Sequence, residues 1–127
     1  MTTKARALEL FQTVYYDSVD RGDMAAAASA YTEDVEWSHA QVWAHHDYQR
    51  DTPPAALRGR AAVEAFLSER RDKLAQARIR HKVRDMVFEN GRGAFLGAVE
   101  GEGRELPFMV WFELRDGLVS RYLLRPL

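Results

Sequence analysis

Histidine, tyrosine and tryptophan are the residues of this sequence that could carry chemistry or bind a ligand. The chain has four histidines, five tyrosines and three tryptophans among 127 residues. Histidine exchanges protons near neutral pH and can act as a general base. A tyrosine phenol, with a pKa of about 10, stays protonated and can stabilise a developing enolate in a dry site. What these residues can do depends on whether the fold brings them together.

Several other kinds of site are excluded or find no support. The absence of cysteine excludes disulfides, zinc–thiolate centres and cysteine nucleophiles. Residues 45–47 read His-His-Asp, but adjacent histidines lack the i, i+4 spacing that places two ligands on one helical face. We therefore expect no metal site. No P-loop, dinucleotide-binding glycine pattern or serine elbow is present, so we also expect no cofactor.

Charge and length narrow the class of protein further. Eighteen basic and nineteen acidic side chains leave a net charge of −1, whereas nucleic-acid binders usually carry a basic excess. No apolar run is long enough to span a membrane, and the first residues lack the core of a signal peptide, so we expect a cytoplasmic protein. A chain of this length suits one domain over residues 1–127.

The first half of the sequence predicts three helices and one strand. Apolar residues at Leu8, Phe11, Tyr15 and Val19 line one face of a helix, and residues 24–30 and 63–74 predict two more helices. Residues 32–34 are expected to turn the chain. Residues 35–39 alternate as a strand does, which puts His39 on the same face as Val35 and Trp37.

The second half of the sequence predicts mainly strands. Residues 40–57 form the least regular stretch, which we interpret as an enlarged loop in which Trp43 and Tyr48 either cover a ligand or anchor the loop. Strands are predicted over 79–88, 94–100, 106–114 and 118–124, with hairpin turns at Asn90-Gly91 and Asp116-Gly117. Helices followed by antiparallel strands indicate an α+β fold.

The order of short motifs resembles one superfamily. The motifs are Val-Asp-Arg-Gly-Asp at 19–23, Tyr-Thr-Glu-Asp-Val-Glu-Trp at 31–37, Leu-Arg-Gly-Arg-Ala-Ala-Val at 57–63 and Arg-Asp-Gly-Leu-Val at 115–119. Their order is similar to the nuclear transport factor 2-like superfamily, which includes SnoaL-like polyketide cyclases, ketosteroid isomerases and scytalone-type dehydratases. The resemblance implies a cone-shaped half-barrel, in which three N-terminal helices close a strongly curved, mainly antiparallel sheet. It also implies an apolar pocket inside the cone and a homodimer through the outer sheet face, including Met109 and Trp111.

The resemblance also implies catalytic roles for three residues. Tyr15 matches the tyrosine that donates the oxyanion hydrogen bond in the isomerases, and His39 falls where those enzymes carry a carboxylate base. His81 matches the strand histidine of the dehydratases. For each there is a structural alternative, a core tyrosine or a solvent-exposed histidine. Asp20 is the nearest match to the aspartate that partners the dehydratase histidine, although we favour a role for Asp20 as a helix-terminal cap.

The pocket wall and the function follow as expectations. The predicted substrate-binding residues are Tyr31, Trp37, Trp43, Phe108, Val110, Phe112 and Tyr122. Val110 stands where the isomerases carry a second oxyanion donor, so a two-donor oxyanion hole is not expected. We predict a cofactor-independent enzyme that abstracts a proton from a small apolar carbonyl substrate, as a cyclase, dehydratase or isomerase. The alternative is a non-catalytic module of the same fold that binds a small ligand or a protein.

Overall fold

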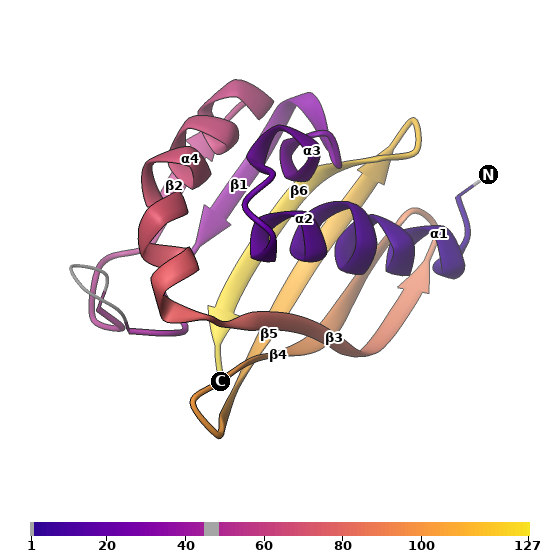
Figure 1. The fold of residues 1–127 in the computed structure, drawn as a ribbon. Coiled ribbons are helices and arrows are strands. Elements are labelled where there is room, and N and C mark those ends of the chain that lie inside the picture. The colour runs from indigo at the N-terminus through magenta and orange to yellow at the C-terminus, as the bar shows by residue number, and fades with distance from the viewer. Residues whose placement is uncertain (1, 45–48) are drawn as a thin grey trace.

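Three helical segments cover one face of the sheet in the computed structural model, which describes residues 2–44 and 49–127 (Figure 1). The first segment runs without a break through α1 (Lys4–Leu8), the π-helix η1 (Glu9–Tyr16) and α2 (Asp17–Asp20). The other two are α3 (Met24–Ala28) and α4 (Arg60–Ala77). The three predicted helices are thus confirmed.

The π-helical turn changes which residues of the first segment face the core. The Asp17 backbone N–H bonds to the carbonyl of Gln12, five residues earlier, which widens the helix by one residue. As a result Tyr15 and Tyr16 are both buried, and Leu10 joins Phe11 in the core. A regular helical period places Tyr15 on the buried face but does not place Tyr16 there.

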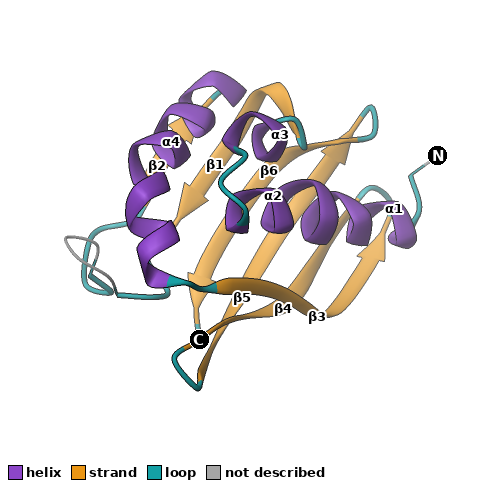
Figure 2. Ribbon diagram, viewed as in Figure 1, coloured by secondary structure: helices purple, strands orange, loops and turns teal. Residues whose placement is uncertain are grey.

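The sheet has six strands in the order β2-β1-β6-β5-β4-β3 (Figure 2). All neighbouring strands are antiparallel except β1 and β6, which are parallel. The strands are β1 (Tyr31–His39), β2 (Ala55–Arg58), β3 (Arg80–Glu89), β4 (Arg92–Gly101), β5 (Arg104–Arg115) and β6 (Leu118–Pro126). The fold is therefore α+β, as predicted.

Two predictions about the first strands were wrong. Residues 32–34 do not turn the chain but belong to β1, whose pairing with β6 is irregular between Tyr31 and Glu36. Residues 55–58 form the edge strand β2, although we expected residues 55–57 to be irregular; Trp37 lies opposite Leu57 in this pairing. The strand has only four residues and directly follows two prolines, so its period is too short to stand out in the sequence.

The predicted hairpin turns are present. Asn90 and Gly91 have φ of 53° and 76°, and Asp116 and Gly117 have φ of 54° and 78°. Two successive positive φ values match the twist of the strands that such a turn joins. These turns fix the register of β3 with β4 and of β5 with β6.

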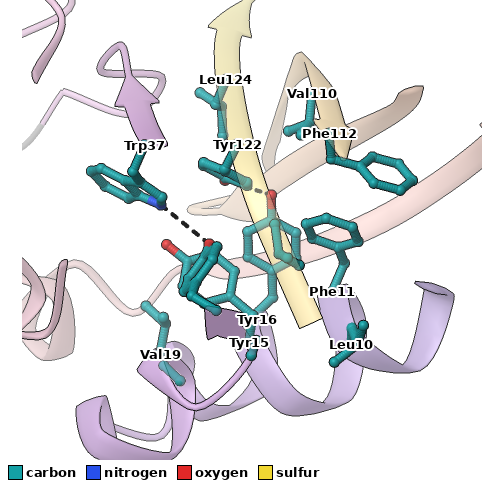
Figure 3. Close-up of a cluster of buried hydrophobic side chains, with 14 of the residues drawn as sticks. Leu10, Phe11, Tyr15, Tyr16, Val19, Trp37, Val110, Phe112, Tyr122 and Leu124 are labelled. Atoms are coloured by element: carbon teal, nitrogen blue, oxygen red, sulfur yellow. Dashed lines mark hydrogen bonds between the residues drawn. The ribbon is translucent and has the colours of Figure 1, made fainter. Parts of the chain in front are cut away.

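The core lies between the helices and the sheet, and aromatic rings make up much of it (Figure 3). The Phe11 ring lies 4.6 Å from that of Phe112 and 4.9 Å from that of Phe95. Gly97 of β4 lies opposite Phe108, and an added Cβ atom there would sit 2.5 Å from the Phe108 ring. Only glycine therefore leaves room for this ring against the strand.

Replacing Gly97 by alanine should lower the free energy of unfolding by about 1–3 kcal/mol, because the Phe108 ring or the strand must shift. Urea denaturation measures this loss. The matched control is Gly103→Asn, since Gly103 has φ of 73° and nothing within 4 Å of an added Cβ, and asparagine tolerates the left-handed region. An equal loss in both variants would contradict the close-packing argument.

Candidate active site

A pocket lies at the end of the cone where α2, α4, the end of β1 and the start of β3 meet. Its wall is mostly apolar and aromatic, with polar groups from Tyr15, His39, His81 and Arg70 among others. The space is small, with a volume of about 50 Å³ available to the centre of a water molecule. A mainly apolar pocket with a few converging polar groups is the usual form of a small-molecule site.

The structure brings the three predicted catalytic residues to this one pocket. Tyr15, His39 and His81 all line it, as do Trp43 and Tyr122 from the predicted substrate-binding set. The other five predicted wall residues are placed differently: the packed core, rather than the pocket wall, contains Tyr31, Trp37, Phe108, Val110 and Phe112. Three of them, Tyr31, Trp37 and Phe108, pack against side chains that line the pocket.

His81 is held by Asp20. The ring Nδ1 lies 2.7 Å from Asp20 Oδ1, and the His81 backbone N–H donates to Asp20 Oδ2 at 2.8 Å. The Asp20 side chain is 6% exposed and that of His81 is 16% exposed, so this pair is shielded from water. Our interpretation of Asp20 as a helix-terminal cap was wrong, because both carboxylate oxygens are used by His81.

The Asp20 contact fixes the protonation pattern of the imidazole ring. An ionised carboxylate only accepts hydrogen bonds, so the proton on the neutral ring sits on Nδ1. The second nitrogen, Nε2, then carries the lone pair and can take a proton. The imidazolium that forms is stabilised by the adjacent carboxylate, as in a His–Asp pair of a catalytic triad.

Gln12 holds the same stretch of β3 from the first helical segment. Its Nε2 donates to the His81 carbonyl at 2.9 Å, and its Oε1 accepts from the Val83 N–H at 2.8 Å. β3 is an edge strand, so these backbone groups have no neighbouring strand on that side. The Gln12 amide takes the place of a peptide group and fixes the strand that carries His81.

The His81 ring also packs face to face with Tyr16. The ring centroids are 5.2 Å apart and the planes differ by 6°. The Tyr16 hydroxyl lies 2.8 Å from that of Tyr122 in the centre of the cluster (Figure 3). Because the Tyr16 ring is buried, this contact limits rotation of the imidazole about its Asp20 hydrogen bond.

His39 occupies a more apolar setting. Its ring stacks on Trp37 at 5.3 Å with an interplanar angle of 5°, and the edge of Phe66 lies 5.9 Å away. Loss of water contact, together with the positive charges of His81 and Arg70, lowers the pKa of His39 from 6.5 to about 3. His39 is therefore a neutral imidazole near pH 7, able to make a hydrogen bond but a weak base.

Tyr15 is buried between other aromatic rings. Its ring meets Tyr31 edge-on at 5.1 Å and Tyr122 edge-on at 5.7 Å. Burial raises the pKa of Tyr15 above the usual value for tyrosine. The phenol thus stays protonated and can donate a hydrogen bond, which is the state that stabilisation of an oxyanion requires.

The loop after β1 contributes Trp43 to the pocket. Trp43 is 3% exposed, and a Cβ atom added at Gly101 would lie 3.1 Å from its indole ring. The Arg104 guanidinium stands 4.7 Å from the ring centroid. Trp43 is thus anchored on the β4–β5 hairpin, whereas His45, His46, Asp47 and Tyr48, which we considered for metal binding or a lid, lie outside the described residues.

Two features are absent from the described part of the chain. No group of three histidine, cysteine, aspartate or glutamate side chains is arranged to hold a metal ion. Within residues 2–44 and 49–127, no helix is long and apolar enough to cross a membrane.

The residues that support the site were not predicted from the sequence. Gln12, Tyr16 and Arg70 were not singled out, and Asp20 was given another role. One signal was available for Asp20, which is the nearest match in the sequence to the aspartate that partners the histidine of the scytalone-type dehydratases. The Gln12 contacts depend on the distant strand residues 81 and 83, so no local sequence pattern predicts them.

Comparison with known proteins identifies the domain. The protein family described as "SnoaL-like domain" matches residues 13–122, which is most of the chain. No curated protein matches.

Solved structures show the same fold. A protein from Kribbella flavida proposed to be a ketosteroid isomerase has a TM-score of 0.67 at 20% identity, over 97% of this chain and 78% of that one. A protein from Sinorhizobium meliloti proposed to be a polyketide cyclase has a TM-score of 0.65 at 14% identity, over 88% and 90%. An NTF-2 like protein of unknown function from Burkholderia xenovorans has a TM-score of 0.67 at 18% identity, over 97% and 84%. Identities this low establish the fold and not an activity.

His39 should remain neutral throughout the range in which most histidines titrate. Imidazole signals followed by NMR from pH 8 to pH 4 should show no midpoint for His39, with the His39→Gln spectrum providing the assignment. A midpoint above pH 5 would contradict the apolar setting described here.

The lowered pKa of His39 also predicts how the stability of the protein depends on pH. Between pH 6.5 and pH 3 the unfolded chain takes up a proton at residue 39 that the folded chain does not, so acidification favours unfolding. The stabilising effect of a neutral His39 is complete above pH 6.5 and is lost toward pH 3. The His39→Gln variant should therefore lose less stability on acidification than the wild type in urea unfolding, and parallel losses would refute this linkage.

Proposed function

The chain belongs to the SnoaL-like domain family, and we propose that it is a cofactor-independent enzyme that abstracts a proton next to the carbonyl group of a small substrate. The observation that carries the proposal is the His81–Asp20 pair at the wall of the apolar pocket. Members of this fold include proteins proposed to be cyclases and isomerases, which is consistent with such chemistry.

His81 is the base in this proposal. Its Nε2 takes the proton from the carbon next to the carbonyl, and Asp20 stabilises the resulting imidazolium. The electron pair of the broken C–H bond moves to the carbonyl oxygen and forms an enolate. Tyr15, protonated and buried, donates a hydrogen bond to that oxygen. His39, neutral and in the same pocket, supplies a second hydrogen bond from its ring N–H.

The two histidines have different roles because their surroundings differ. An aspartate faces His81, whereas His39 stacks on Trp37 and lies near the positive charge of Arg70. When two titratable groups have such contrasting surroundings, one can act as the base and the other as a hydrogen-bond donor. The sequence left the identity of the base open, and the Asp20 contact favours His81.

The enolate can react in three ways. Return of the proton from His81 to another carbon completes an isomerisation, and attack on a second carbonyl of the substrate closes a ring. Departure of a β-hydroxyl group, protonated by His81, completes a dehydration. The three outcomes share the first proton transfer, so an experiment on that step tests them together.

The first step can be measured as hydrogen–deuterium exchange. In D₂O the wild type should speed the exchange of the α-protons of 2-tetralone, an apolar ketone, over the rate in buffer. His81→Ala should lower the enzymatic rate by about 10²–10⁴-fold. Asp20→Asn should lower it by about 10²-fold or more, because the imidazole loses both its orientation and its counter-charge.

Lys82→Gln is the matched control, because Lys82 neighbours His81 but projects from the other face of the strand. Its exchange rate should equal that of the wild type. Full activity in His81→Ala would sink the proposal that His81 is the base. If the wild type binds 2-tetralone without exchanging its protons, the domain acts instead as a non-catalytic ligand-binding module.

We also propose that two copies of the chain associate through the outer face of the sheet. Apolar side chains there are unusually exposed, with Val87 at 69%, Leu96 at 44% and Met109 at 43%. Leu96 and Met109 lie directly opposite each other on β4 and β5, and Trp111, next to Ala94, is half-buried on the same face. Adjoining apolar side chains of this kind are typical of an interface.

Light scattering during gel filtration tests this association. The wild type should elute at twice the mass of one chain, and Met109→Lys should shift it to one, because a charge would be buried without a partner. Gln76→Lys, on the exposed surface of α4, adds the same charge elsewhere and should leave the dimer intact. A wild type at the mass of one chain would contradict this interface.

A further inference from the structure

A glutamine amide lies among the aromatic and apolar side chains of the pocket. Gln41 comes two residues after the end of β1 and lines the pocket together with His39. The Ala40 backbone N–H donates to the Leu124 carbonyl at 3.2 Å, which continues the pairing of β1 with β6 beyond His39. The alternation of an extended strand puts Gln41 on the same face as His39. The two polar side chains are therefore neighbours along one wall.

One hydrogen bond fixes the orientation of the Gln41 amide. Its Nε2 donates to the Trp43 carbonyl at 2.6 Å, and the side chain is partly buried. A carbonyl oxygen only accepts hydrogen bonds, so the amide nitrogen, and not the amide oxygen, faces it. Among residues 2–44 and 49–127, no partner bonds to Gln41 Oε1. This oxygen is thus a hydrogen-bond acceptor that is left for a ligand.

The carbonyl group of a substrate cannot satisfy this acceptor. A carbonyl oxygen also only accepts hydrogen bonds, and in the proposed mechanism Tyr15 and His39 donate to it. A simple ketone that filled the pocket would displace water from Gln41 Oε1 and supply no donor in its place. An acceptor that is shielded from water and unpaired costs free energy. A ligand with a donor at this point therefore binds more tightly.

We propose that the substrate carries a hydroxyl group, which donates a hydrogen bond to Gln41 Oε1. This inference rests on the proposed function and narrows its substrates from small carbonyl compounds to small hydroxylated carbonyl compounds. Two residues of an extended chain span about 7 Å, so the groups that bind to His39 and Gln41 lie a few bonds apart in the ligand. Gln41 is in this view a specificity-determining residue.

A hydroxyl group on the second carbon from the carbonyl suits the dehydration among the three outcomes. His81 takes the proton from the carbon between the two groups. The electron pair of that C–H bond becomes the new C=C bond, and the C–O bond breaks with its electron pair on the oxygen. The oxygen leaves as water with the proton from His81. Because its own hydrogen points to Gln41, its lone pairs stay available for that proton.

The test compares two ketones of nearly the same shape, diacetone alcohol and methyl neopentyl ketone, which differ by a hydroxyl in place of a methyl group. Titration of ¹⁵N-labelled wild type follows the indole N–H signals of the tryptophans. Trp43 lines the pocket and Trp111 lies on the outer sheet face, so both ketones should shift only the signal of Trp43 of these two. Although the methyl compound is more hydrophobic, the wild type should bind diacetone alcohol about fivefold or more tightly.

The Gln41→Leu variant decides whether this residue is responsible. It removes the acceptor at similar volume, so the ratio of the two affinities should change by about tenfold, in favour of methyl neopentyl ketone. A shift of Trp43, whose carbonyl loses its donor, would weaken the binding of both ketones alike and leave the ratio unchanged. The control Gln76→Leu removes an exposed amide of α4 and should keep the wild-type ratio.

Three results would overturn the proposal. They are equal binding of the two ketones by the wild type or a preference for methyl neopentyl ketone, no binding of diacetone alcohol at millimolar concentration, and an unchanged ratio in Gln41→Leu.

The binding measurement is independent of proton transfer. His81→Ala should keep the wild-type ratio, because the hydrogen bond to Gln41 does not involve the imidazole. If Gln41 selects diacetone alcohol but His81→Ala keeps full exchange activity on 2-tetralone, the base assignment fails and the hydroxyl site stands. If exchange depends on His81 but the wild type shows no preference for the hydroxyl, the proposed function stands and the inference about Gln41 fails.

Discussion

The candidate site depends on hydrogen bonds that join the first helical segment to the edge of the sheet. Gln12 and Asp20 satisfy three backbone groups of β3, the N–H and carbonyl of His81 and the N–H of Val83. Unpaired backbone groups at a buried position cost free energy, so the helix and the strand stabilise each other. The same carboxylate also binds the His81 ring. One contact thus sets the position of the strand, the orientation of the imidazole and the proton it carries.

Aromatic packing supplies the second constraint. The tyrosines at 15, 16, 31 and 122 and the tryptophan at 37 form a continuous cluster at the pocket, of which Tyr15, Tyr16 and Tyr122 line the wall. The hydroxyls of Tyr16 and Tyr122 meet each other, and that of Tyr31 accepts from the Trp37 indole N–H. The cluster gives the site an apolar wall of packed aromatic rings. The different surroundings of His81, which Asp20 contacts, and of His39, which stacks on Trp37, underlie the different roles that we propose for them.

The sequence predicts the fold well because the fold rests on local signals. The spacing of the helices, the alternation of the strands and the turns at Asn90-Gly91 and Asp116-Gly117 can each be recognised within about ten residues. The short strand β2 and the extension of β1 back to Tyr31 depend on pairing with distant strands, and so were not predicted. For the site, residue type together with the resemblance to the superfamily pointed to Tyr15, His39 and His81 as candidates, and the fold brings them to one pocket. The supporting residue Gln12 acts through tertiary contacts that no spacing reveals.

The π-helical turn implies that the register of the first helical segment has been altered by a single residue. In a regular α-helix each residue rotates by about 100°. In a regular α-helix, the eight residues from Gln12 to Asp20 would place the two side chains about 80° apart around the axis. The wider π-helical turn takes up one residue and returns Asp20 to the face of the helix that carries Gln12, so both side chains reach β3. A deletion of one residue within η1 would therefore leave this alignment in place, whereas a regular α-helix with the same number of residues would separate the two contacts.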